Sequence, residues 1–117
     1  MPVTTQVSVR PAVAEDSALI LQFIRQLAEY EKLLDDVRAT LDDITVALFG
    51  HNPKAFCDIA EIDGRPVGFA LWFYNFSTFV GRHGIYLEDL FVQPQARGSG
   101  AGKALLANLA RRCVDEN

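Results

Sequence analysis

The sequence IYLEDLFVQPQARGSGAGKALL, from Ile85 to Leu106, decides the fold, because a strand, a glycine loop and a helix follow one another in it. The apolar and aromatic residues of Ile85–Val92 predict a strand, which Gln93-Pro94 ends. Gly98–Gly102 is a glycine-rich loop, and the chain turns helical from about Gly100. Glycine has no Cβ, so such a loop lets a ligand approach the backbone N–H groups closely.

This glycine loop is suited to an anion, because the first turn of a helix carries unpaired N–H groups and the positive end of the helix dipole. Arg97 adds a positive charge at its entrance. Two common phosphate motifs do not fit. The P-loop needs Ser or Thr where Ala104 follows Gly102-Lys103, and a dinucleotide fingerprint starting at Gly98 needs glycine at Lys103. The spacing predicts a phosphate site, and a flexible turn that only caps the helix is the alternative.

Five further segments show the periodicity of regular structure. Runs that alternate apolar and polar residues, or that are rich in β-branched and aromatic residues, predict strands. Apolar residues at helical spacing predict helices. The predicted strands are Val3–Arg10, Ala55–Ile62 and Val67–Phe79, and the predicted helices are Ala14–Glu31 and Thr40–Phe49.

Local signals predict where these segments end. Thr40 and Asp43 have the spacing of a capping box at the start of the second helix, and Gly50 suits the left-handed position after its end. Asp63-Gly64 predicts a type I′ hairpin turn, which needs positive φ at both residues. Gly81–Gly84 predicts a second turn.

The resulting order is strand, helix, helix, three antiparallel strands, glycine loop, helix. It predicts the α+β class, with a mostly antiparallel mixed sheet flanked by helices. A strand followed by a helix usually returns as a parallel strand. We therefore expect residues 1–117 to be the incomplete N-terminal portion of a single domain, truncated after the glycine-loop helix. A compact domain whose last helix simply covers the sheet is the alternative.

Composition narrows the class of protein. The 117 residues are 50% hydrophobic, which fits one globular domain. The longest apolar run, Val67–Phe76, is about half the length that spans a bilayer, and the N-terminus shows no secretory signal.

Fifteen acidic and 11 basic residues give a net charge of −4, which argues against a nucleic-acid partner. Cys57 and Cys113 fit neither a disulfide framework nor a zinc site. We expect a cytoplasmic protein without metal or membrane partner.

The motif Arg97-x-x-Gly100-x-Gly102, directly after a strand, resembles the pyrophosphate loop of the GNAT family of N-acetyltransferases. Gln95-x-x-Gly98-x-Gly100 fits a looser form of the same motif. The resemblance spans nearly the whole chain, and the last three of the segments below are similar to the diamine (spermidine/spermine) N-acetyltransferase branch. The segments that carry it are Val9-Arg10-Pro11-Ala12, Leu27-Ala28-x-Tyr30-Glu31, Val67-Gly68-Phe69-Ala70 and Tyr86-Leu87-Glu88-Asp89-Leu90-Phe91-Val92.

The resemblance implies a GNAT-like acyl-CoA N-acyltransferase fold with acetyl-CoA as co-substrate. Backbone amides of the loop would hold the pyrophosphate of coenzyme A (CoA), and the main chain of the preceding strand would pair with the pantetheine arm. The implied loop residues are Arg97, Gly98, Ser99, Gly100, Ala101, Gly102 and Lys103, and the implied strand residues are Leu90, Phe91 and Val92.

The same resemblance implies that Glu88 accepts the proton of the acceptor amine and that Asp89 contacts the cationic acceptor, with Tyr30 and Glu31 as further contacts. Each has a plainer alternative, namely a solvated carboxylate for Glu88 or Asp89 and a packing role for Tyr30. The family's general-acid tyrosine belongs to a part of the domain that follows Asn117.

The chemistry of the residues favours direct transfer. An amine is protonated near pH 7 and attacks a thioester only when neutral, so a base is needed. Glu88 and Asp89 are consecutive on a strand, so we expect them on opposite faces and not as a carboxylate dyad. An acyl-cysteine route needs an activated thiolate. Cys57 lies in a predicted strand and Cys113 in a predicted helix, without a histidine near either in sequence.

The sequence therefore predicts an acetyl-CoA-dependent N-acetyltransferase that moves an acetyl group to a small cationic amine, polyamine or lysine-like. We expect a homodimer. A non-catalytic CoA-binding or dimerising fragment that lacks the general acid is the alternative, and an enzyme that acetylates proteins is a third.

Overall fold

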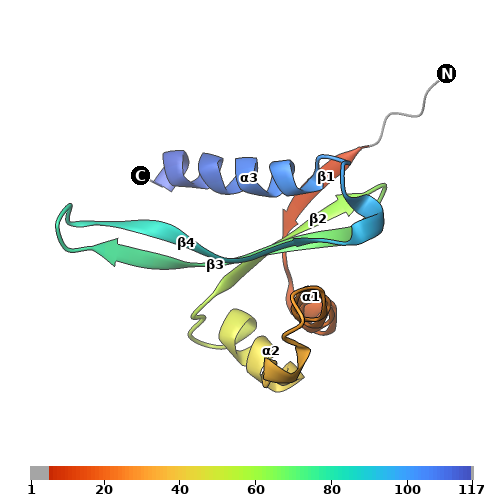
Figure 1. The fold of residues 1–117 in the computed structure, drawn as a ribbon. Coiled ribbons are helices and arrows are strands. Elements are labelled where there is room, and N and C mark those ends of the chain that lie inside the picture. Colours follow the sequence, from red (N-terminus) through yellow and green to blue (C-terminus); the bar gives the residue numbers. More distant parts are fainter. Residues whose placement is uncertain (1–5, 117) are drawn as a thin grey trace.

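The computed structural model describes residues 6–116, which form one antiparallel sheet with a helical layer on each face. Figure 1 shows two helices on one face and the last helix running across the other. The α+β class and the largely antiparallel sheet are confirmed, and each strand pair described is antiparallel. In chain order the elements are β1 (Val7–Pro11), α1 (Ser17–Tyr30), α2 (Leu41–Phe49), β2 (Phe56–Ile62), β3 (Arg65–Ser77), β4 (Arg82–Val92) and α3 (Ala101–Glu116), with short 3-10 turns at Ala14–Asp16, Leu34–Asp36 and Pro94–Ala96.

The sheet follows the sequence order β1-β2-β3-β4, so β1 and β4 are its edge strands. The predicted first strand, Val3–Arg10, begins at Val7 in the structure, and residues 3–5 of the prediction lie outside the described residues. Consecutive residues of β3 enter different cores, because side chains of a strand alternate between its faces. Phe69 packs with Phe23 under α1 and α2, whereas Ala70 packs with Leu105 under α3.

The predicted turn and cap signals are largely confirmed. The Thr40 hydroxyl accepts from the Asp43 N–H (3.1 Å), and the Asp43 carboxylate accepts from the Thr40 N–H (2.9 Å). Asp63 and Gly64 have φ of 53° and 81°, as a type I′ turn requires. The reason given for Gly50 is wrong, because its φ is −73°. Glycine is needed there because a Cβ would lie 2.5 Å from the Val46 carbonyl oxygen.

The predicted turn at Gly81–Gly84 is also wrong in its extent. The chain turns over residues 78–81, where Gly81 alone has a positive φ (76°), and β4 already begins at Arg82. Gly84 pairs with Asn75 inside the ladder. As a result β3 and β4 outrun β2 and project as a two-stranded arm (Figure 1), at whose tip Phe79 is fully exposed.

A buried carboxylate holds α3 on its face of the sheet. Asp58 of β2 is 1% exposed. It accepts hydrogen bonds from the Trp72 indole N–H (3.0 Å) and from the Asn108 amide of α3 (3.2 Å). Arg112 of α3 lies 3.6 Å from the same carboxylate and over the Trp72 ring. These contacts fix the helix whose first turn adjoins the glycine loop.

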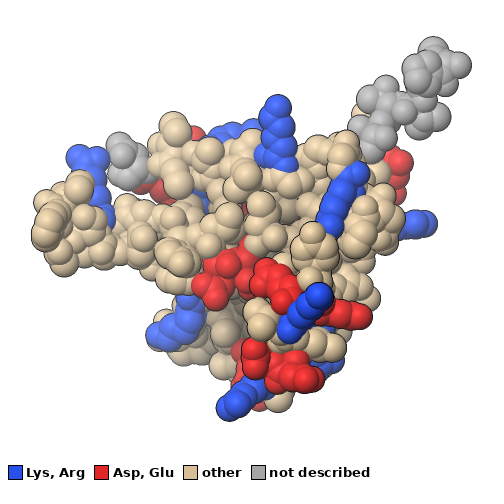
Figure 2. Space-filling model, viewed as in Figure 1, with Lys and Arg blue, Asp and Glu red and all other residues tan. Residues whose placement is uncertain are grey.

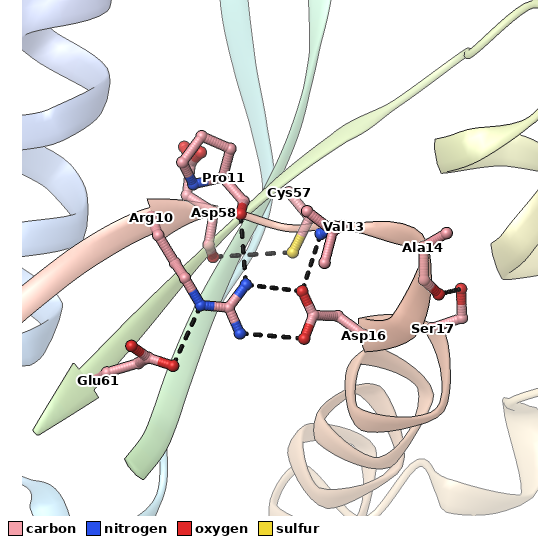
Figure 3. A network of polar contacts seen from close by, with 9 residues as sticks. All are labelled: Arg10, Pro11, Val13, Ala14, Asp16, Ser17, Cys57, Asp58 and Glu61. Carbon is pink, nitrogen blue, oxygen red and sulfur yellow. Dashed lines mark hydrogen bonds and ion pairs between the residues drawn. The ribbon is translucent and has the colours of Figure 1, made fainter. Parts of the chain in front are cut away.

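A second polar network joins β1, β2 and the start of α1 (Figure 3). The Arg10 guanidinium donates to both carboxylate oxygens of Asp16, at 2.7 and 3.0 Å, and to Glu61 at 3.1 Å. Asp16 also accepts from the Val13 N–H (2.8 Å). These hydrogen bonds, those of Arg10 first, hold the pKa of Asp16 below its usual range.

This lowered pKa predicts a pH-dependent contribution to stability. A carboxyl whose pKa is lower in the folded state stabilises the fold above its unfolded pKa, about 3.9, and loses that contribution as the pH falls through the folded pKa. We expect Asp16→Asn to lower the free energy of unfolding at pH 7, because it weakens the hydrogen bonds that Asp16 accepts from Arg10. The expected loss is about 1–2 kcal/mol, since Arg10 is partly solvated.

Urea denaturation at pH 7 and at steps below pH 4 checks this. The deficit of Asp16→Asn should shrink in acid, and Asp115→Asn, at an exposed site near the end of α3, should show no deficit at any pH. A deficit that is the same at every pH would contradict the assignment.

Candidate functional site

Two positions of the glycine loop have a backbone conformation that favours glycine. Gly98 and Gly100 have φ of 83° and 93°, in the left-handed region that favours glycine. Gly102 differs, because it lies in the first turn of α3 and a Cβ there would meet only the Val92 side chain at an ordinary 3.7 Å. Gly98 and Gly100 therefore shape the loop, whereas Gly102 leaves the helix start open to a ligand.

Several N–H groups of this loop are available to a ligand. The Ser99 N–H donates to the Ala96 carbonyl and the Ala101 N–H to the Ser99 hydroxyl, whereas Ala104 already makes a helical bond to Gly100. Within residues 6–116 no protein acceptor is found for the N–H groups of Gly98, Gly100, Gly102 and Lys103. Donors of this kind, at the positive end of a helix, suit a pyrophosphate.

The strand leading into the loop offers a free backbone edge. Gln93 donates its N–H to the Val67 carbonyl, so Gln93 and Val67 occupy a hydrogen-bonded position of the ladder. Antiparallel ladders alternate, and the register therefore turns the backbone groups of Phe91 toward β3 and those of Leu90 and Val92 toward the open edge. An extended ligand arm beside β4 would meet Leu90 and Val92.

The Arg97 side chain connects the loop to α1. Its guanidinium carbon lies 4.5 Å from the centre of the Tyr30 ring, and its Nε donates to the Val92 carbonyl (3.2 Å). Tyr30 is 64% exposed, so this is a surface cation–π contact. Two predicted site residues that are far apart in the sequence thus lie together at the mouth of the loop.

A β-bulge lies at Glu88, and it breaks the strand alternation on which one prediction rested. Leu71 pairs with Asp89 and Trp72 with Leu87, so Glu88 has no partner residue in β3. The premise that Glu88 and Asp89 must face opposite sides of a regular strand therefore does not hold. The bulge changes the direction of the Glu88 side chain relative to a regular strand, and this side chain is exposed.

Two carboxylates act on the pKa of a third beside this bulge. The pKa of Asp89 is raised, first by burial and then by the negative charges of Glu88 and Glu31. Asp89 is half-buried, whereas Glu88 and Glu31 are exposed. Figure 2 shows that acidic side chains gather on this face around the end of α1. Such a patch attracts a cationic ligand and disfavours an anionic one.

The cysteines do not provide a nucleophile near these groups. Cys57 is buried, and burial raises the pKa of its thiol far above the range of a reactive cysteine. Cys113 is exposed on α3. In the part of the chain that the structure describes, no group of three His, Cys, Asp or Glu side chains is arranged to hold a metal ion, and no helix is long and apolar enough to cross a membrane.

Two features of the site were not predicted. The bulge at Glu88 depends on the pairing of β3 with β4, and a chain of amide hydrogen bonds runs from Gln95 through Gln93 to Gln26 of α1. No local sequence signal marks either. A cavity of about 320 Å³ opens beside this chain, lined by Tyr30, Phe91 and Pro94 among others.

The chain is similar to known acetyltransferases in sequence. The Acetyltransferase (GNAT) family model matches residues 18–117. Thialysine N-epsilon-acetyltransferase of Sus scrofa is 40% identical over 118 residues, covering 94% of this chain and 69% of that protein. Spermidine/spermine N(1)-acetyltransferase-like protein 1 of Homo sapiens is 34% identical over 113 residues, 91% of this chain and 16% of that protein.

The fold matches solved structures at lower identity. An aminoglycoside acetyltransferase from an uncultured soil metagenomic sample, solved with sisomicin, superposes with a TM-score of 0.77 at 14% identity. The match covers 94% of this chain and 71% of that one. At this identity the likeness concerns the fold.

Proposed function

The chain belongs to the GNAT family of acetyltransferases, and from this premise we propose that it transfers an acetyl group from acetyl-CoA directly to the amine of a small cationic acceptor. The observation that carries the proposal is a set of N–H groups, those of Gly98, Gly100, Gly102 and Lys103, for which the described residues supply no acceptor. They lie beside β4, an edge strand of the described sheet. This donor set fits a pyrophosphate, and the open backbone of Leu90 and Val92 fits the amides of a pantetheine arm.

The chemistry divides among the chain's own residues. Acetyl-CoA supplies the acetyl group as a thioester. Glu88, exposed at the bulge, takes a proton from the acceptor ammonium, so that the neutral amine attacks the carbonyl carbon. A C–N bond forms and the C–S bond breaks. The further proton that the nitrogen loses as it becomes an amide goes to the departing sulfur, so that CoA leaves as the thiol. Asp89 and Glu31 attract the cationic acceptor to this position.

The proposed acceptor is a polyamine or a lysine-like amine. The negative charges of Glu31, Glu88 and Asp89, which lie close enough to interact, favour such a cation. Thialysine and spermidine/spermine appear in the names of relatives. A homodimer in the cytoplasm belongs to the same proposal. Binding of CoA without turnover by any amine in a panel would instead favour the non-catalytic alternative.

Gly102→Glu tests the cofactor site. We expect it to weaken CoA binding at least tenfold, about 1.4 kcal/mol, because a carboxylate in the first turn of α3 repels the pyrophosphate. The space around Gly102 accepts a Cβ, so the fold should be retained.

Isothermal titration calorimetry with CoA measures the affinity, and circular dichroism checks the fold. Gly102→Gln is the matched control, because it has almost the same size without the charge and should bind CoA more tightly than Gly102→Glu. Equal affinities of Gly102→Glu and the unmodified chain would refute the pyrophosphate assignment.

A further inference from the structure

The N–H groups proposed for the pyrophosphate belong partly to α3, so their position depends on how this helix lies on the sheet. Gly102 and Lys103 are in its first turn. The Cα atoms of a helix lie about 2.3 Å from its axis, so a rotation of about 30° displaces the first turn by roughly 1 Å. A hydrogen bond of about 2.9 Å loses much of its strength after such a displacement. The rotation of α3 therefore affects the affinity for an anion on the loop.

The apolar contacts of α3 hold the helix against the sheet but specify its rotation weakly. Leu105 and Leu109 lie in one buried cluster with Ala60 and Ala70 of the sheet. Alanine side chains are short, and the attraction between apolar groups has no preferred direction. A small rotation of α3 would therefore keep most of this burial.

The directional contacts of α3 converge on one buried carboxylate, that of Asp58. Its Oδ2 atom accepts from both the Trp72 indole N–H (3.0 Å) and the Asn108 amide (3.2 Å). The Arg112 guanidinium lies 3.6 Å from Oδ1 and over the Trp72 ring. Within residues 6–116 no hydrogen-bond partner is found for the buried Nε atom of Arg112, so Asn108 makes the better-defined contact from α3. We call these four residues the Asp58 cluster.

Asn108 lies on the face of α3 that packs on the sheet. It follows Leu105 by three residues and Ala101 by seven, which are the spacings of one helical face. Gly102 precedes Asn108 by six residues, or about 9 Å along the axis at a rise of 1.5 Å per residue. Because a helix turns as one body over so short a length, a hydrogen bond at Asn108 also sets the position of the first turn.

Stability alone does not account for a carboxylate at this position. Burial raises the pKa of Asp58, because the charged form loses its hydration. The hydrogen bond from Trp72, the charge of Arg112 and the hydrogen bond from Asn108 act in the opposite direction. Buried ion pairs often stabilise a fold no more than apolar residues of the same size do. Unlike an apolar residue, however, Asp58 gives α3 a directional contact.

We propose that Asp58 is a positioning residue for the candidate cofactor site, because through Asn108 it fixes the rotation of α3. The N–H groups of Gly102 and Lys103 are thereby held where a pyrophosphate can accept from both. This inference rests on the proposed binding of CoA. A ligand on the loop and the Asp58 cluster act on the same helix, so each favours the orientation that the other needs.

Asn108→Ala tests the proposal, because it removes one hydrogen bond to Asp58 and leaves the contacts of Trp72 and Arg112 in place. Calorimetric titration should show CoA binding weakened about tenfold, since the loop donors are less well aimed at a charged group. The midpoint of urea denaturation should stay close to that of the unmodified chain, because alanine is a better helix former than asparagine. Asp115→Ala, at an exposed position of the same helix, is the matched control and should change neither quantity.

The fluorescence of Trp72, the single tryptophan, distinguishes positioning from a merely structural role. Without ligand, the emission of Asn108→Ala should differ from that of the unmodified chain. Saturating CoA should move it back toward the unmodified value, because bound CoA favours the native rotation of α3. The unmodified chain should change little on CoA binding, since its helix is already oriented.

The outcomes separate this inference from the proposed function. Equal CoA affinities of Asn108→Ala and the unmodified chain, or an emission difference that CoA does not alter, would overturn the positioning role although CoA is bound. A loss of affinity that Asp115→Ala shares, or that comes with a lowered urea midpoint, would overturn it as well. If the unmodified chain does not bind CoA, the proposed function itself fails, and the inference fails with it.

Discussion

Replacing Glu88 with glutamine is expected to lower kcat/KM for amine acetylation by about 10²- to 10⁴-fold, the usual contribution of a general base. Glutamine keeps the size and the hydrogen-bonding capacity of the side chain but cannot take the ammonium proton. The bulge at Glu88 comes from the strand register and not from its side-chain charge. The fold should therefore be unchanged, and the loss should appear in kcat.

The pH profile distinguishes a base from a charge that merely attracts the acceptor. The limb that reports the base should disappear in Glu88→Gln, measured with a single amine across the whole pH range because the amine titrates too. Glu15→Gln, at an exposed position before α1, is the matched control and should keep both rate and profile. An unaltered rate and profile in Glu88→Gln would return Glu88 to the role of a solvated carboxylate.

Phe23→Ala is expected to lower the free energy of unfolding by about 3–5 kcal/mol, the usual cost of emptying a buried phenylalanine site. Phe23 is 0% exposed. The centre of its ring lies 5.5 Å from the ring centre of Phe69 and 6.1 Å from that of Phe91. It therefore joins α1 to the two strands that carry the candidate site. A loss of this size is a large part of the about 5–15 kcal/mol that stabilises a typical domain.

Urea denaturation followed by the fluorescence of Trp72, the single tryptophan, measures this loss. Phe79→Ala is the matched control, because Phe79 is fully exposed at the tip of the β3–β4 arm and should change stability by no more than about 0.5 kcal/mol. A similar loss in both variants would show that the arm tip is packed in solution, and a small loss in Phe23→Ala would show that the core under α1 tolerates the vacancy.

Local signals in the sequence account for the backbone of the glycine loop and for the turns and caps. The left-handed backbone of Gly98 and Gly100 and the turn at Asp63-Gly64 follow from which residues tolerate positive φ. The capping box of Thr40 and Asp43 follows from contacts within one helical turn. In each case the responsible atoms lie within a few residues of one another, so the sequence alone contains the whole interaction.

Only the tertiary structure decided how distant segments meet around that loop. The bulge at Glu88 exists because the register between β3 and β4 shifts by one residue there. The Arg97 guanidinium lies over the Tyr30 ring because α1 packs beside the end of β4. The β2–β3 hairpin, which carries Arg65, lines one cavity together with loop residues because the sheet places β3 beside β4. Composition and local propensity thus determined the class and the loop, and the family resemblance indicated the candidate carboxylates. Register and packing join residues far apart in the sequence, and these determined which side chains share a site and which backbone groups stay open to a ligand.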